Sequence, residues 1–181
     1  GNVYGGANTA VLYGTVDLNI GAFDDSLITS PIRIDGTVFG GGEANASGDP
    51  NYDYSFISVT KGIDIQIDGS NYDEFYIKGS IFGSGNASST EGYSYIDISN
   101  YGTFENYQEN ISIQRADIVT LKNSVIKLEG TTDRTNEFST TEFSISRVKE
   151  LKIANDSTLF LDNGTNLLEK WNSLKIDGDQ E

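Results

Sequence analysis

The chain has 181 residues and a formal net charge of −15, and it contains neither Cys nor His. This length allows one domain with a substantial core, while the two missing residue types exclude disulfides, thiol or imidazole catalysis and the usual zinc sites. So acidic a chain repels phosphate backbones and anionic membrane surfaces, and it has no apolar run that could form a transmembrane helix. Nucleic acid partners and membrane insertion are therefore not expected.

An apolar–aromatic–glycine phrase recurs in the first half of the chain. Residues 34–42 (IDGTVFGGG) match residues 77–85 (IKGSIFGSG), and residues 3–9 (VYGGANT) form a shorter copy. Internal repetition over tens of residues is typical of solenoids, in which each repeat is one coil. The phrase pairs two apolar residues with glycines just before a variable polar segment, which predicts a short strand followed by a tight corner.

The repeated residues also predict how the coils stack. If each phrase lies in one coil, Val38 stacks on Ile81, or Phe39 on Phe82, inside the molecule. A β-sandwich has strands of similar length but gives no reason for such phrases to recur, so we favour a solenoid.

Alternating strands are expected between the phrases. Residues 16–20 (VDLNI), 63–67 (IDIQI) and 93–98 (YSYIDI) place apolar side chains at alternate positions, which predicts one buried and one exposed face per strand. Gly, Asn and Asp punctuate these strands and tolerate the positive φ angles that corners need. Polar segments expected to protrude as loops are residues 24–31, 43–55, 70–75, 84–92, 99–109 and 130–141.

The second half repeats with different residues. Residues 118–128 (IVTLKNSVIKL) parallel residues 150–161 (ELKIANDSTLFL), which places Asn123 and Asn155 at equivalent points between two strands. In a stack of parallel coils such residues can form an amide ladder, or they can be ordinary turn asparagines. The one segment with a helical pattern is a single turn at residues 166–171.

These features predict an all-β chain, a parallel β-solenoid of about five to six irregular coils with protruding polar loops. Residues 1–181 are expected to form one solenoid domain. The chain enters directly on a repeat phrase without a Met, and we interpret it as a fragment of a larger surface protein.

The VFGGG and IFGSGN phrases, followed by Ile, Val and Leu triplets around Lys-Asn-Ser, resemble the pectate-lyase-like right-handed β-helix domains of Gram-positive bacterial surface adhesins. The resemblance extends over most of the chain. It implies a right-handed parallel β-helix, located extracellularly at the bacterial cell surface, that serves without catalysis in adhesion or in presenting other domains.

Tyrosines crowd the middle third of the chain, mostly in or beside the predicted loops. Exposed rings near Asp and Asn suit binding to a glycan, or to a host or cell-surface protein. The alternative is that these rings stack along the solenoid and cover its sheets. The predicted ligand-binding residues are Tyr52, Tyr54, Tyr72, Tyr76, Tyr93 and Tyr95.

One acidic loop is a candidate Ca²⁺ site. Glu43, Asp49, Asn51 and Asp53 supply oxygen ligands, several at a spacing of two residues, as calcium loops do. A solvated acidic loop is the alternative and is favoured. No other cofactor is predicted.

Two further functions remain as alternatives to adhesion. The first is a rigid structural stalk. The second is a polysaccharide lyase or glycoside hydrolase, for which carboxylate pairs such as Asp64 with Asp68, or Asp17 with Asp35, could act. None of the four arginines lies in a lyase motif, so we expect no catalysis. The open ends of a solenoid also favour end-to-end or edge self-association.

Overall fold

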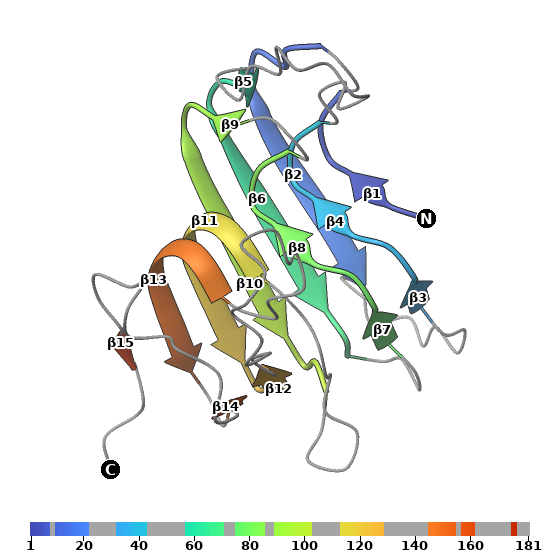
Figure 1. The fold of residues 1–181 in the computed structure, drawn as a ribbon, viewed down its shortest axis with the longest axis vertical. Helices are drawn as coiled ribbons and strands as arrows, with labels where there is room; N and C mark the ends of the chain where they lie inside the picture. The colour runs from blue at the N-terminus through green and yellow to red at the C-terminus, as the bar shows by residue number, and fades with distance from the viewer. Residues whose placement is uncertain are drawn as a thin grey trace, which may run out of the picture.

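The computed structural model describes residues 1–7, 10–21, 32–42, 57–70, 75–85, 89–102, 113–128, 145–154, 157–161 and 175–176. Within these ranges all regular structure is β, without helices, and all strand pairs are parallel (Figure 1). The predicted all-β class and the parallel pairing are confirmed. The helical turn predicted at residues 166–171 lies outside the described residues.

One nine-stranded sheet contains both kinds of predicted strand. Its short strands are β1 (Val3–Tyr4), β4 (Val38–Phe39) and β8 (Ile81–Phe82). Its long strands are β2 (Thr15–Gly21), β6 (Gly62–Asp68), β10 (Tyr93–Ser99), β11 (Ile113–Lys122) and β13 (Ile145–Ala154). The order is β1-β4-β8-β11-β10-β6-β2, with β13 paired to β11 and β15 (Lys175–Ile176) paired to β13.

Three two-stranded sheets complete the described part. They pair β3 (Ile32–Ile34) with β7 (Phe75–Ile77), β5 (Ile57–Val59) with β9 (Ser89–Thr90), and β12 (Val125–Leu128) with β14 (Thr158–Leu161). In each sheet a strand pairs with its counterpart from the next repeat of the sequence, which is why no antiparallel hairpin forms among the described strands.

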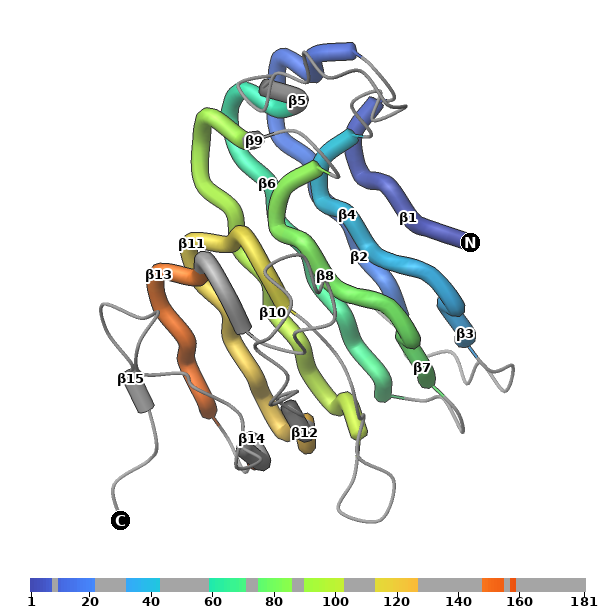
Figure 2. The backbone as a smooth tube through the Cα atoms, viewed as in Figure 1, coloured from blue at the N-terminus to red at the C-terminus, as the bar shows by residue number. Residues whose placement is uncertain are grey.

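The nine-stranded sheet curls into a half-barrel. Its long strands lie side by side from β2 to β13, and the row of β1, β4 and β8 forms a second layer across them (Figures 1 and 2). Strand β11 joins the two rows, because its first residues pair with β8 and its later residues pair with β10. Closure of the strands into complete right-handed coils stays a prediction.

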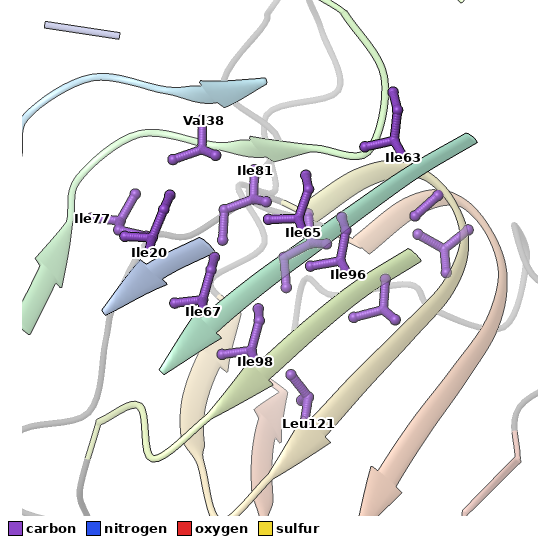
Figure 3. Packing of buried hydrophobic residues seen from close by; sticks show 14 of the residues in the cluster. Ile20, Val38, Ile63, Ile65, Ile67, Ile77, Ile81, Ile96, Ile98 and Leu121 are labelled. Carbon is purple, nitrogen blue, oxygen red and sulfur yellow. The ribbon is translucent and has the colours of Figure 1, made fainter. Parts of the chain in front are cut away.

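The core lies between these two layers. On β6 the side chains of Ile63, Ile65 and Ile67 are buried and alternate with residues that face outward. They pack with buried residues of the neighbouring strands, among them Ile96 and Ile98 of β10 (Figure 3). Burying each such side chain contributes about 1.5–3 kcal/mol. The predicted alternation of buried and exposed residues is therefore confirmed.

The repeated phrases stack in register. Val38 lies opposite Ile81 and both are fully buried in the core, as predicted for one of the two candidate pairs. The aromatic residues form a separate column, in which the rings of Tyr4 and Phe39 are 5.0 Å apart and those of Phe39 and Phe82 are 5.1 Å apart. Both pairs thus stack, but only the aliphatic pair belongs to the core cluster.

The first glycine of each phrase lies where the two layers approach closely. A Cβ on Gly40 would overlap Ile63 Cγ2 and lie 3.0 Å from Ile65 Cδ1. The equivalent glycines meet the same row of the long strands: Gly5 meets Val16 and Gly83 meets Ser94. The phrase therefore requires glycine for packing between layers, in addition to any turn that follows it.

In the repeat that contains β11, the chain turns a corner directly after the residues that pair with β8. Ile113 and Gln114 pair with the phrase strand β8, and Arg115 then takes a φ of 56° before β11 continues beside β10. Because Gln114 replaces the aromatic residue of the phrase, the aromatic column ends at Phe82, whose ring lies 5.4 Å from the Arg115 guanidinium. The two kinds of repeat therefore share one architecture.

An amide ladder runs along the ends of the long strands. Asn123 Nδ2 donates to Asn100 Oδ1 at 2.7 Å, and Asn100 Nδ2 donates to Asp68 Oδ1 at 2.9 Å. Both asparagines have positive φ, 46° and 52°, as corner residues do. Both interpretations of Asn123 therefore fit, since its amide bonds along the stack and its backbone turns a corner. A bond between Asn123 and Asn155 stays a prediction, because Asn155 lies outside the described residues.

Candidate binding face on the long strands

The outer face of the long strands is the surface opposite the core. Strand register arranges its side chains in rows that cross the strands. One row contains Asp17, Asp64 and Tyr95 on β2, β6 and β10, in which Asp64 pairs with Asp17 on one side and with Tyr95 on the other. The next row contains Asn19, Gln66 and Asp97 on the same strands. Adjacent members of a row are separated by about 4.8 Å, the distance between neighbouring strands.

Two tyrosines form an aromatic platform on this face. The rings of Tyr93 and Tyr95 are stacked, with centroids 4.7 Å apart and planes inclined by 27°, and each residue is 37% exposed. The ring of Tyr93 lies over Gly62 of β6, where any Cβ would overlap the ring. The absence of a side chain at Gly62 therefore leaves the space in which the ring of Tyr93 packs against the sheet.

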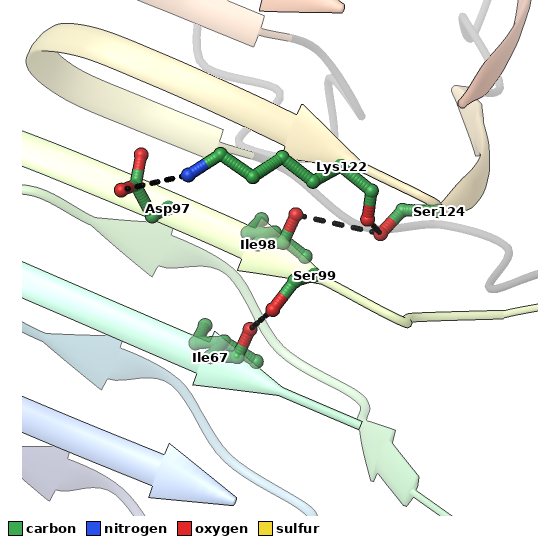
Figure 4. Close-up of polar contacts among 6 residues, drawn as sticks. All are labelled: Ile67, Asp97, Ile98, Ser99, Lys122 and Ser124. Carbon is green, nitrogen blue, oxygen red and sulfur yellow. Dashed lines mark hydrogen bonds and ion pairs between the residues drawn. The ribbon is translucent and has the colours of Figure 1, made fainter. Parts of the chain in front are cut away.

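The charges beside this platform are mainly negative. Partial burial, followed by the nearby charges of Asp97 and Asp17, raises the pKa of Asp64 above the ordinary value of an Asp side chain. Lys122 Nζ lies 3.6 Å from Asp97 Oδ2 and offsets part of that charge (Figure 4). Among the described residues no cation forms an ion pair with Asp17 or Asp64.

Serine hydroxyls fix the strand ends that border this face. Ser99 Oγ donates to the carbonyl of Ile67 at 3.3 Å, and Ser124 Oγ lies 3.4 Å from the carbonyl of Ile98 and 2.8 Å from that of Lys122 (Figure 4). The bonds to Ile67 and Ile98 link one repeat to the next, and the bond to Lys122 closes the corner after β11. They keep the strands in register, so the rows of the outer face stay aligned.

The structure places three of the six predicted ligand-binding tyrosines. Tyr93 and Tyr95 lie together on β10, whereas Tyr76 lies on β7 in another sheet, 5.8 Å from the Arg33 guanidinium. The remaining three lie outside the described residues: Tyr52, Tyr54 and Tyr72.

A further tyrosine of the same crowded region is structural. Tyr101 is buried, and its Oη accepts a hydrogen bond from the backbone N–H of Ile77 at 3.1 Å. Its ring meets Phe75 edge-on at 5.5 Å. Burial raises the pKa of Tyr101 well above that of an exposed tyrosine. For this ring the structural interpretation holds.

The predicted calcium ligands lie outside the described residues: Glu43, Asp49, Asn51 and Asp53. Within the part of the chain that the structure describes, no three acidic side chains are grouped as a metal site would require.

The carboxylate pairs considered for catalysis do not form compact pairs. Asp64 and Asp68 are four residues apart on β6, which separates their Cα atoms by about 13 Å, and Asp68 Oδ1 accepts a hydrogen bond from Asn100 Nδ2 at the end of the strand. Asp17 lies on β2, whereas Asp35 follows β3 and forms an ion pair with Arg33, with Nε and Oδ1 2.8 Å apart.

A comparison with protein families, curated proteins and solved structures finds no match to this chain. The resemblance to bacterial surface β-helices therefore stays a prediction, and the functional argument rests on the geometry described above. In the described residues no helix has the length and apolar character needed to cross a membrane.

Proposed function

We propose that the chain is a non-enzymatic binding module of the bacterial cell surface that holds a glycan on the outer face of its long strands. The observation that carries this proposal is the stacked pair of Tyr93 and Tyr95, exposed on a sheet and flanked by polar side chains. Pyranose rings pack their C–H faces on such aromatic rings. Their hydroxyl groups hydrogen-bond to carboxylates and amides of the kind that Asp64 and Gln66 provide.

We also propose that the parallel strands are successive coils of a right-handed β-solenoid. The stepwise pairing of β2, β6, β10, β11 and β13 supports this, because each strand pairs with its equivalent in the next repeat. The close approach of the two layers at Gly40 supports it too, since the short strands then cover the same core as the long ones.

This architecture suits an extended ligand. The rows of outward side chains repeat at the strand spacing of about 4.8 Å, which is close to the length of one sugar unit in an extended polymer. Tyr93 is already seated on Gly62 and stacked on Tyr95, so a ligand finds the rings ordered in advance. Pre-ordered contact groups reduce the conformational entropy lost on binding.

A rigid stalk is the second candidate function. The continuous aromatic column of Tyr4, Phe39 and Phe82 and the amide ladder favour it, because both bond one repeat to the next along the stack. A stalk needs no ligand, so the two functions differ in whether the outer face binds anything.

A glycan array distinguishes the two functions. We expect the chain to bind a subset of polysaccharides, and the double substitution Tyr93→Ala with Tyr95→Ala to abolish that binding while the circular dichroism spectrum stays unchanged. Tyr13→Ala is the matched control, because Tyr13 is 83% exposed but precedes β2 and lies outside the outward rows. A folded wild-type chain that binds nothing on a broad array would reject glycan binding and leave the stalk.

A further inference from the structure

From the charge beside the aromatic platform we infer that the preferred ligand is a cationic glycan, a polymer of amino sugars with free ammonium groups. This inference rests on the proposed glycan-binding function and adds the chemical class of the ligand. Three features of the outer face support it: the aromatic rings, the carboxylates beside them, and the straight rows in which both are arranged.

The aromatic platform suits a cation as well as a sugar ring. The face of a tyrosine ring carries partial negative charge and attracts ammonium groups within about 6 Å of the ring centroid. Tyr93 lies over Gly62 and stacks on Tyr95, so the ring of Tyr95 offers the face for a ligand. A pyranose with an ammonium substituent can therefore place its ring on Tyr95 and its charge near Asp64, the residue opposite Tyr95.

The carboxylates next to the rings favour the same ligand. Asp64 is directly opposite Tyr95 across the β6–β10 pair, and Asp17 extends the same row on β2. Partial burial, then the charge of Asp97 and then that of Asp17 raise the pKa of Asp64, and among the described residues neither Asp17 nor Asp64 has an ion-pair partner. A ligand ammonium group in this row would supply the compensating charge.

Charge also excludes the other glycan classes as preferred ligands. A polyuronate would be repelled by Asp17 and Asp64 and by the net charge of −15. A neutral polymer would stack on the tyrosines but leave these carboxylates without a counter-charge. A basic peptide would satisfy the charge, but its side chains are flexible and lose conformational freedom when they are ordered on a flat face. The rows therefore fit an amino-sugar polymer best.

Three hexasaccharides with the same β-1,4 backbone test the inference. They carry an ammonium, an acetamide or a hydroxyl group at C2: the hexamers of glucosamine, N-acetylglucosamine and glucose. We expect isothermal titration at pH 6 and low salt to show the glucosamine hexamer binding about tenfold more tightly than the other two, with an advantage that shrinks as salt is added.

Variants separate the roles of charge and rings. Asp17→Asn with Asp64→Asn should weaken the glucosamine hexamer about fivefold to tenfold, and should change the affinity of the glucose hexamer much less, because an asparagine amide still hydrogen-bonds to sugar hydroxyl groups. Tyr93→Ala with Tyr95→Ala should weaken both hexamers. Asp35→Asn, which removes a carboxylate beside β3, is the matched control and should change neither affinity.

The possible failures are distinguishable. Equal, tyrosine-dependent affinity for all three hexamers would overturn the cationic preference and leave the proposed glycan binding intact, whereas no binding of any hexamer together with a silent array would reject both. Hexalysine that binds as tightly as the glucosamine hexamer and depends on the same tyrosines would overturn the inference in favour of a basic peptide. A dimer detected by light scattering and lost in the Tyr93→Ala, Tyr95→Ala variant would overturn it in favour of a second copy of the chain.

Discussion

Substituting Gly40 by Ala tests whether the two layers of the fold are in contact. Gly40 follows β4, and its φ lies outside the left-handed region, so the backbone accepts an L-residue without strain. The added methyl group would overlap Ile63 Cγ2 and lie 3.0 Å from Ile65 Cδ1. Gly40→Ala therefore changes mainly the packing between the layers, with one further close contact of 3.3 Å to the carbonyl oxygen of Gly83.

The magnitude follows from how little those neighbours can move. Ile63 and Ile65 are fully buried, and both pack in the core cluster, so neither can swing into solvent. Overfilling a packed core costs about 1–3 kcal/mol, and this site belongs in the upper part of that range. For a chain of this length such a loss lowers the melting temperature by about 4–10 °C.

Calorimetry of Gly40→Ala beside Gly14→Ala provides the assay. A methyl group added at Gly14 would have no atom within 4 Å, and the φ of Gly14 is also outside the left-handed region, so Ala there should be neutral or stabilise by about 0.4–1 kcal/mol. Ile63→Ala should cost less in the Gly40→Ala background than in the wild type, because it removes the isoleucine methyl group that the new Cβ overlaps. If both glycine variants melted at the same temperature and the double variant were additive, the layers would not meet at Gly40.

Three further predictions concern polar groups. Asp64→Asn should raise the melting temperature at pH 7 and leave it unchanged at pH 3. The raised pKa of Asp64 means that its ionised form destabilises the folded state. This penalty disappears as the pH falls through that pKa and Asp64 becomes protonated in the folded and the unfolded state alike. Tyr101→Phe should cost about 1–2 kcal/mol in urea unfolding, because the buried N–H of Ile77 loses its acceptor, and an unchanged midpoint would contradict that role. Asn123→Ala should lower the free energy of unfolding by about 2 kcal/mol, because it removes the hydrogen bond to Asn100 and places Ala at a strained positive φ. Asn123→Gly should lose only the hydrogen bond, because Gly accepts a positive φ. Equal losses in the two variants would exclude the contribution of φ.

The sequence predicted those features that depend on local pattern. Alternation alone identified the strands at Ile63 to Ile67 and Tyr93 to Ile98, because the side-chain period of a strand is two residues. Repetition of the phrase correctly paired Val38 with Ile81, because equivalent residues of successive repeats occupy the same position along the stack.

Features that depend on register between distant segments escaped prediction. Asn100 joins the ladder although it is followed by Tyr, so it lacks the Asn-Ser sequence that marks Asn123. Tyr101 resembles the neighbouring loop tyrosines in sequence. The chain turns a corner at Asn100, however, and the side chain of Tyr101 is buried in the core directly after it. The pairing of β10 with β11 brings Asn100 to Asn123, whereas Tyr101 meets Ile77 and Phe75 of β7, and no local pattern encodes either alignment.

The location of the described tyrosines also changes where binding should be sought. The crowding of tyrosines in polar segments had favoured the loops, yet Tyr93 and Tyr95 lie on β10, whose neighbours β6 and β11 hold it by in-register hydrogen bonds on both sides. A loop tyrosine must be ordered when a ligand binds, whereas a ring seated on Gly62 is ordered beforehand. Each strand of the sheet also adds one side chain to a row at the strand spacing, which no single loop can do. Affinity for an extended polymer should therefore depend on the different side chains that β2, β6 and β10 place in one row.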